Sequence, residues 1–121
     1  MTDQDVRRLS AVADVYADVD AEGARELRLL VAGAKVSLAS KIPRSSVTMN
    51  SRLRLEDADG RERELSVVYP WDASADRISV ISPFGRALLG VDIGATVRDG
   101  TRSLRLTAIP YQPEASGDHH L

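Results

Sequence analysis

Three carboxylates stand close together near the N-terminus, at Asp18, Asp20 and Glu22. Clustered carboxylate oxygens are the ligands that a hard divalent cation such as Mg²⁺ prefers, so this pattern could support metal-assisted chemistry. The same residues also fit a structural interpretation, in which Asp20 caps a helix, Glu22 complements the helix dipole and Asp18 is solvated. We favour the structural interpretation and expect no metal site and no cofactor.

A second group of candidate residues is the segment Ser82-Pro83-Phe84-Gly85-Arg86. Ser82 suits the N-cap of a helix and Pro83 its first position. A short helix that begins here would present free backbone amides at this corner. Phe84 and Arg86 are residue types that are enriched at binding hot spots. Phe84 could equally belong to the core face of the helix, and Ser82 and Pro83 could be only its start signal. We take Ser82, Pro83, Phe84 and Arg86 as the candidate partner-binding residues.

Basic residues recur at every second position on both sides of a turn signal at residues 59–60. We expect Arg52 and Arg54 to share one strand face, with Arg61 and Arg63 facing them across the turn, which could form a patch for an acidic partner helix. Three glutamates are interleaved with these arginines: Glu56, Glu62 and Glu64. A solvated face of cross-strand ion pairs is therefore the favoured interpretation.

The chain lacks the usual machinery of covalent catalysis. It has no cysteine, no Gly-x-Ser-x-Gly elbow and no glycine-rich phosphate loop. Its two histidines, His119 and His120, follow Asp118 at the C-terminus, and no further ligands at a fitting spacing complete a metal site. We therefore expect a loosely ordered tail there, no catalytic residue, and a protein that is not an enzyme.

The elements that must position these residues differ between the two parts of the chain. In the first 41 residues the apolar side chains follow helical steps of three and four, which form two stripes: Val6, Leu9, Ala13 and Tyr16, then Ala24, Leu27, Val31 and Ala34. Thr2 can cap the first helix and Asp20 the second. Helices of about 14 residues would not persist alone in water, so we expect a short antiparallel hairpin, a coiled coil that reaches about 20 Å. Asp18, Asp20 and Glu22 would form its tip.

The rest of the chain changes to the alternation that is typical of strands. Val47 to Leu55 alternate, and residues 59–60 then supply the turn of a hairpin whose return strand runs from Leu65 to Tyr69. Further strands are expected around residues 78–80, 95–98 and 103–109, with a short helix over 84–89. The tail from Pro110 is expected to fold loosely or to fray. The only tryptophan, Trp71, lies in a loop, where it could cover the core edge or anchor a partner.

These patterns predict an α+β protein with two parts. Residues 1–41 form the short helical hairpin, and residues 42–121 form a domain with about five mostly antiparallel strands and one short helix. Residues 42–46 are the hinge between the parts, since Pro43 ends any helix before it.

The composition of the chain limits which classes of partner it can bind and in which compartment we expect it. The chain has 16 basic and 18 acidic residues, a net charge of −2, which argues against a general nucleic-acid binder. No apolar run is long enough to span a membrane, and the N-terminus lacks the basic start and apolar core of a signal peptide. The absence of cysteine fits a reducing compartment. We expect a cytoplasmic monomer that binds neither membranes nor specific nucleic-acid sequences.

Four segments in the C-terminal part resemble a known family: VTMNSRLRL (47–55), LSVVYPWDA (65–73), ISVISPFGRALLGVDIGATV (78–97) and YQPEASGDHHL (111–121). In this order and spacing they are similar to the regulators of nucleoside diphosphate kinase, the Rnk family, which belongs to the wider group of Gre transcript-cleavage factors. The resemblance covers most of residues 42–121. Residues 1–40 match only in their helical-hairpin plan.

The resemblance implies an FKBP-like fold for residues 42–121 and RNA polymerase as the partner. In the Gre group this domain docks at the rim of the polymerase secondary channel, and acidic residues at the tip of a coiled coil hold a magnesium ion that assists cleavage of backtracked RNA. Rnk-like proteins carry a much shorter coil, which implies the same docking site without cleavage. In Gre factors the Ser-Pro corner follows an acidic residue, whereas Ile81 stands at that position here.

We therefore expect a transcription factor that docks on RNA polymerase with Ser82, Pro83, Phe84 and Arg86 and modulates elongation by competing with Gre factors. Two alternatives stay open: a true cleavage factor that uses the tip carboxylates and, from the FKBP-like fold alone, a peptidyl-prolyl isomerase. An isomerase pocket of that type needs a cluster of aromatic side chains, and the chain has one Phe, one Trp and three Tyr.

Overall fold

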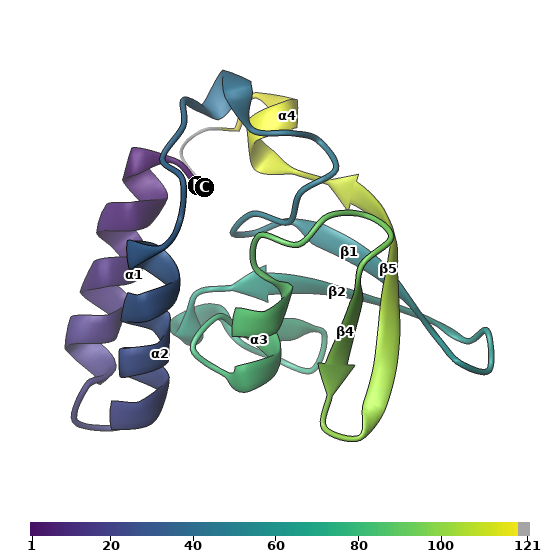
Figure 1. The fold of residues 1–121 in the computed structure, drawn as a ribbon, viewed down its shortest axis with the longest axis horizontal. Coiled ribbons are helices and arrows are strands. Elements are labelled where there is room, and N and C mark those ends of the chain that lie inside the picture. The colour runs from purple at the N-terminus through teal and green to yellow at the C-terminus, as the bar shows by residue number, and fades with distance from the viewer. Residues whose placement is uncertain (119–121) are drawn as a thin grey trace.

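The computed structural model describes residues 1–118, and the interpretation of His119 and His120 lies outside them. Two helices, α1 (Asp3–Tyr16) and α2 (Ala21–Ala32), form an antiparallel hairpin that lies beside a five-stranded curled sheet with the short helix α3 (Pro83–Leu88) (Figure 1). The predicted α+β class, with a helical hairpin ahead of the sheet, is confirmed.

The caps of the hairpin form as the sequence predicts. The Thr2 hydroxyl accepts a hydrogen bond from the Asp5 amide at 3.1 Å, and the Asp20 carboxylate accepts one from the Gly23 amide at 2.9 Å. The second apolar stripe is shorter than predicted, because α2 ends at Ala32 with Gly33 as its cap and leaves Ala34 outside the helix. Glycine loses the most backbone freedom in a helix, which explains why the helix stops there.

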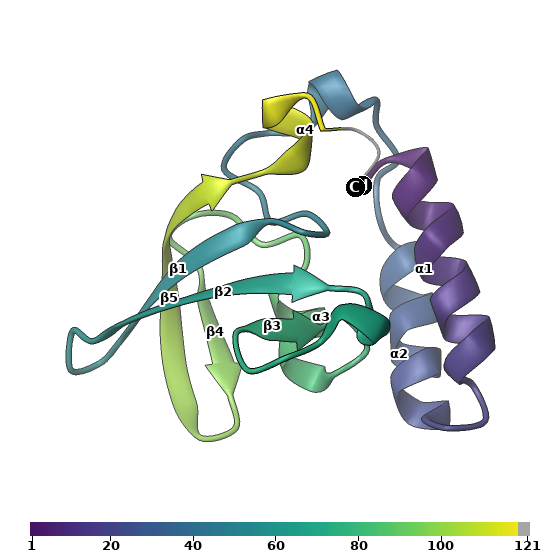
Figure 2. The ribbon, with the colours of Figure 1, turned by 180° about the vertical axis from the view of Figure 1, so that it is seen from behind.

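The sheet has the strand order β3-β2-β1-β5-β4. Its strands are β1 (Arg52–Asp57), β2 (Glu62–Val68), β3 (Arg77–Ser79), β4 (Thr96–Asp99) and β5 (Arg102–Tyr111). The pairs β1/β2, β1/β5 and β4/β5 are antiparallel, and only the short edge strand β3 pairs in parallel, with β2. The turn at residues 59–60 forms as predicted, with Gly60 at φ 79°. Figure 2 shows the sheet curling around α3, while the hairpin runs along one side.

The strand predicted over residues 47–55 is only partly correct. Val47 and Met49 are buried, as the alternation requires, but β1 begins at Arg52. Between them the chain turns at Asn50, whose φ of 64° lies in the left-handed region that asparagine tolerates better than most residues. The Ser51 hydroxyl accepts a hydrogen bond from the Thr48 amide at 3.0 Å and fixes this turn.

The core is shared by the hairpin and the sheet. Leu9 and Leu27 from the hairpin, Leu65 from the sheet and Leu88 from α3 are all fully buried members of one apolar cluster. Burying such side chains is the main stabilising contribution to a domain of this size. The hairpin therefore shares one core with the body of the molecule, beside which it lies in Figures 1 and 2.

The tail from Pro110 is better ordered than the sequence predicts. β5 continues through Tyr111, and a short helix, α4 (Pro113–Ser116), follows it. Gln112 is buried, and its amide donates hydrogen bonds to the carbonyls of Pro43 and Ser46 at 2.7 and 2.8 Å. These bonds satisfy backbone groups of the hinge at residues 42–46, so the tail and the hinge hold each other in place. Among residues 1–118 no helix is both long and apolar enough to cross a membrane.

Candidate partner-binding site

The corner between β3 and α3 is rigidly built. The Ser82 hydroxyl accepts a hydrogen bond from the Gly85 amide at 3.1 Å and donates one to the Ser79 carbonyl at 2.7 Å. A Cβ on Gly85 would lie 2.0 Å from that same carbonyl oxygen, so the close approach of helix and strand requires glycine. The Arg86 amide bonds the Ser82 carbonyl. Two amides of the helix N-terminus, those of Gly85 and Arg86, are thus bonded within the corner rather than open as the sequence predicts, and Pro83 is exposed on it.

Phe84 sits at the boundary between core and surface. It is 8% exposed and belongs to the apolar cluster. The guanidinium carbon of Arg63 lies 5.7 Å from the ring centroid, within range of a cation–π interaction. Arg63 also pairs with Asp99 at 3.2 Å. Three distant segments, β2, α3 and the end of β4, are thereby tied together around one ring.

Arg86 is half-buried and partly committed to the backbone. Its Nη1 donates a hydrogen bond to the Ile81 carbonyl at 2.6 Å, which spans the corner from the helix back to the loop. Ile81 itself is 8% exposed and contributes to the core. An uncharged, buried side chain therefore occupies the position before Ser82.

A groove of about 500 Å³ runs beside this corner. Its lining comes from β2, β3, the corner and the β4–β5 turn: Arg63, Ile78, Ser82, Pro83, Phe84, Arg98, Asp99 and Gly100. Three of the four predicted partner-binding residues thus line one concave surface, whereas Arg86 is not among the residues that line it. Apolar contacts with a few convergent charged groups are the usual composition of a recognition groove.

The predicted hairpin tip carries its three carboxylates in different environments. The Asp20 side chain is committed to the Gly23 amide as a cap, whereas Asp18 and Glu22 are exposed. Val19 between them is 81% exposed. Within residues 1–118, no group of three or more His, Cys, Asp or Glu side chains is placed to hold a metal ion.

The arginines near the β1–β2 turn do not form one patch. Glu64 pairs with Arg52 at 3.5 Å and with Arg54 at 3.6 Å on the outer face of the sheet, as cross-strand pairing predicts. Arg63 was expected on this face, but it pairs in register with Leu55 and therefore lies on the core side, over Phe84. Alternation places neighbouring residues on opposite faces, so Arg63 and Glu64 could not both face Arg54.

Trp71 is 64% exposed, and one face of its ring covers a residue at the edge of the core. Its ring stacks on the buried ring of Tyr69, with centroids 5.2 Å apart and an interplanar angle of 5°. The stack fixes the orientation of an aromatic surface that faces solvent.

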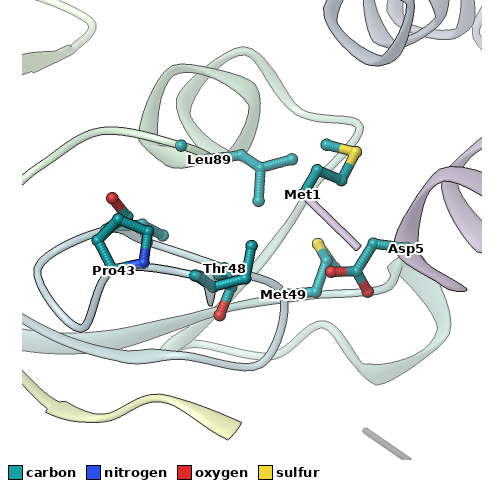
Figure 3. A pocket seen from close by; sticks show the side chains of 10 residues that line it. Met1, Asp5, Pro43, Thr48, Met49 and Leu89 are labelled. Atoms are coloured by element: carbon teal, nitrogen blue, oxygen red, sulfur yellow. The ribbon is translucent and has the colours of Figure 1, made fainter. Parts of the chain in front are cut away.

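A buried polar cluster joins the base of the hairpin to the C-terminal part, and sequence reasoning missed it. Asp5 on α1 is only 5% exposed and lines a cavity of about 130 Å³ with Met1, Pro43, Thr48 and others, where Figure 3 shows its carboxylate beside Met49. Burial, reinforced by the nearby charge of Glu114, raises the pKa of Asp5 to about 6.

Glu114 accepts a hydrogen bond from the Thr48 hydroxyl at 2.5 Å, which connects α4 to the turn at residues 47–51. Burial, with Asp5 nearby, also raises the pKa of Tyr69 to about 12. Asp5 and Glu114 are 109 positions apart in the sequence, so no local pattern could have brought them together.

The family model for the C-terminal part of the transcription elongation factors GreA and GreB matches residues 42–109. The chain belongs to the GreA/GreB family. The match includes β1 to β4, β5 as far as residue 109 and the Ser82 corner, so the candidate site lies within the part of the chain that the family model matches. A transcription factor of the Gre type is therefore the class of this protein.

Relatives of known name extend the Gre assignment to the hairpin. The regulator of nucleoside diphosphate kinase of Escherichia coli K12 is 31% identical over 129 residues, which cover 100% of this chain and 95% of that protein. The transcription elongation factor GreA of Sinorhizobium medicae is 30% identical over 116 residues, covering 85% of this chain and 73% of GreA. The resemblance to the Rnk family is confirmed.

A solved Gre structure has the same arrangement. A prokaryotic transcription elongation factor GreA/GreB from Nitrosomonas europaea superimposes with a TM-score of 0.83 at 28% identity, over 92% of this chain and 98% of that one. The likeness includes the hairpin as well as the sheet, because residues 42–109 alone would not reach that coverage. These relatives are named as regulators or elongation factors and not as enzymes of metabolism.

Proposed function

We propose that this chain binds RNA polymerase at the rim of the secondary channel through residues 42–121 and modulates elongation without cleaving RNA. The family assignment supports the partner, and the exposed Pro83 beside the groove supplies a rigid surface on which a large enzyme could seat. A surface fixed by capping and ion pairing loses little entropy on binding, which favours affinity.

The observation that carries the non-cleaving role is the size and placement of the hairpin. Helices of 14 and 12 residues span about 20 Å at 1.5 Å per residue. The hairpin also shares its buried apolar side chains with the sheet and α3, and Figure 2 shows it beside the body of the molecule. Asp20 is used as a cap, which leaves Asp18 and Glu22 as the exposed carboxylates of the tip.

In this role the chain displaces longer Gre factors from a shared docking site by mass action. The hairpin crowds the channel mouth, and the tip carboxylates contribute a negative potential there. The isomerase alternative has no support from the groove, which is lined by a single aromatic ring, that of Phe84.

The proposal is tested with purified core RNA polymerase and a labelled Gre factor. Wild-type chain should displace the labelled factor in a concentration-dependent way, and the double variant Ser82→Ala, Pro83→Ala should need at least about tenfold more protein. Backtracked elongation complexes with Mg²⁺ should show no RNA shortening when the chain is added. Shortening that disappears in Asp18→Asn, Glu22→Gln would overturn the non-cleaving role, and a failure to displace would overturn the shared site.

A further inference from the structure

Asp5 lies in the first turn of α1 with only 5% of its surface exposed, although a carboxylate is costly to remove from water. Asp5 lines two hollows. The first is the cavity of about 130 Å³, which Thr48 and Leu89 line from the C-terminal part. The second, of about 240 Å³, is lined by residues 37–39 after α2 and by Glu114 of α4. The start of α1, residues 37–39 and α4 lie at one end of the molecule (Figure 1), and together they form what we call the base joint.

The charged and titratable groups around Asp5 come from three elements of the fold. They are Asp3, Arg7, Arg8 and the N-terminal ammonium at the start of α1, Tyr69 after β2, and Glu114 on α4. Asp3 and Arg7 are exposed and pair with each other at 3.4 Å. Residues 37–39, the remaining side of the hollow, have no titratable side chain. The close like charge that faces Asp5 from another element is therefore that of Glu114.

These surroundings favour the protonated form of Asp5. Burial and the charge of Glu114 oppose ionisation of the carboxyl. The Thr2 hydroxyl, Arg8 and the N-terminal ammonium favour ionisation, but burial prevails and raises the pKa of Asp5 to about 6. The carboxyl therefore loses its proton within the range of pH in which most proteins stay folded. Once ionised, it is a buried charge beside a like charge, and the fold gains if the two can separate or take up water.

The α4 side of the base joint is held by a small number of polar contacts. Glu114 accepts a hydrogen bond from the Thr48 hydroxyl at 2.5 Å, and the Gln112 side chain ties the start of α4 to the hinge. The helix itself has four residues and closes with the Ser116 amide on the Gln112 carbonyl at 3.1 Å. A short element with few buried apolar contacts opens at a lower free-energy cost than the core does.

The other side of the base joint is attached in a similar way. The Ser37 amide donates a hydrogen bond to the Met1 carbonyl at 2.9 Å, which holds the segment after α2 against the start of α1. The apolar cluster begins farther along α1, at Leu9, and holds the hairpin to the sheet independently of this bond. Residues 37–39 and α4 can thus move away from Asp5 while the hairpin keeps its place in the core.

We propose that the base joint is a proton-operated latch: it is closed while Asp5 carries its proton, and ionisation of Asp5 opens it locally while the rest of the fold stays intact. Opening brings water to the carboxylate and moves Glu114 away from it, which removes both causes that oppose its charge. A rise in pH then loosens the segment that connects the hairpin to the sheet. The inference goes beyond the proposed function, because it concerns the chain alone and its test needs no polymerase.

Hydrogen exchange followed by NMR tests the latch amide by amide. The protection factors of the Ser37 and Ser116 amides, corrected for intrinsic exchange rates, should fall by about threefold or more between pH 5 and 7.5. Low concentrations of urea should leave their exchange unchanged, because a local opening exposes little surface. The Leu106 amide, bonded to Ala95 inside the sheet, should exchange more slowly and respond to urea. Protection that does not fall with pH, or that falls only through urea-sensitive unfolding, would overturn the latch.

Three variants identify the group that operates the latch. Asp5→Asn should keep Ser37 and Ser116 equally protected from pH 5 to 7.5. Glu114→Gln keeps an acceptor for the Thr48 hydroxyl but removes the like charge, so it should reduce the loss of protection and shift it to lower pH. Asp3→Asn is the matched control, because Asp3 lines the same hollow but is exposed, and it should follow wild type. A pH dependence that persists in Asp5→Asn, or that disappears in Asp3→Asn, would contradict the assignment to Asp5.

Discussion

The hairpin tip and the Ser82 corner both carry residues with the chemistry for a functional site. The two regions differ in how firmly their side chains are held. At the corner, a cap, a glycine approach, a cation–π contact and an ion pair hold every side chain in place. At the tip, Asp18 and Glu22 are exposed, and only Asp20 is fixed, by a single hydrogen bond to its own helix.

The difference separates recognition from local structure. Recognition of a partner surface requires groups that are ordered before binding, because ordering them afterwards subtracts from the affinity. Solvated carboxylates at a loop give long-range potential but no defined geometry. The corner is therefore suited to specific docking, while the tip can contribute charge.

The largest expected effect contrasts two buried glycines, one in each region. A Cβ on Gly85 would lie 2.0 Å from the Ser79 carbonyl oxygen, which is backbone and cannot move alone, so Gly85→Ala should cost about 3 kcal/mol or more. A Cβ on Gly23 would meet mainly the Asp20 carboxylate, a side-chain end that can rotate away, so Gly23→Ala should cost about 1 kcal/mol or less. Urea unfolding measures both. Equal losses of unfolding free energy in the two variants would contradict the distinction between a rigid corner and an adaptable tip.

A second contrast lies within the hairpin, between its buried base and its exposed tip. The ordinary pKa of an Asp carboxyl is 3.8, and that of Asp5 is raised to about 6 by burial and by Glu114, against the opposing effects of Thr2, Arg8 and the N-terminal ammonium. Between these pH values the folded state holds more protons than the unfolded state, so stability should fall as the pH rises from about 4 to 6.

Asp5→Asn should remove this fall and be more stable than wild type at pH 7 by about 2 kcal/mol, converging below pH 4. Asp18→Asn, at the exposed tip, should follow the wild-type profile throughout. Denaturant midpoints across the pH range provide the measurement. A wild-type profile that is flat between pH 4 and 6 would show that Asp5 is not protonated preferentially in the folded state.

Local signals predicted much of this molecule. The caps at Thr2, Asp20 and Ser82 and the turn at residues 59–60 depend on neighbours within four positions, and each formed as expected. The alternation over residues 47–55 predicted burial correctly but missed the turn at Asn50. Burial follows side-chain polarity, whereas one left-handed residue changes the backbone path without changing the pattern.

The features that the sequence did not predict are formed by distant residues. Arg63, Phe84 and Asp99 meet because β2, α3 and β4 converge, and their register cannot be read from any one segment. The same holds for Gln112, which orders both the tail and the hinge through Pro43 and Ser46. The type of each residue was visible, but the partner that gives it a role was not.

The two N-caps provide a smaller contrast. Ser82→Ala and Asp20→Ala should each cost about 1 kcal/mol, since both remove a side-chain acceptor from a helix N-terminus. Only Ser82→Ala should also weaken polymerase binding, because Ser82 bonds Ser79 and positions the corner. Parallel stability and binding assays on the two variants separate a capping role from a docking role. Equal binding losses would mean that the tip contributes to the interface as directly as the corner.

The smallest expected effect is at the tip itself. Asp18→Asn combined with Glu22→Gln neutralises two exposed carboxylates that make no ion pair with the described residues, so stability should change by less than about 0.5 kcal/mol. Affinity for the polymerase should change by no more than about threefold, with the change largest at low salt, because only a screened long-range potential is lost. Competition assays at two salt concentrations measure this. A large, salt-independent loss would require that these carboxylates make direct contacts inside the channel, and the tip would then be a second recognition site of the same kind as the corner.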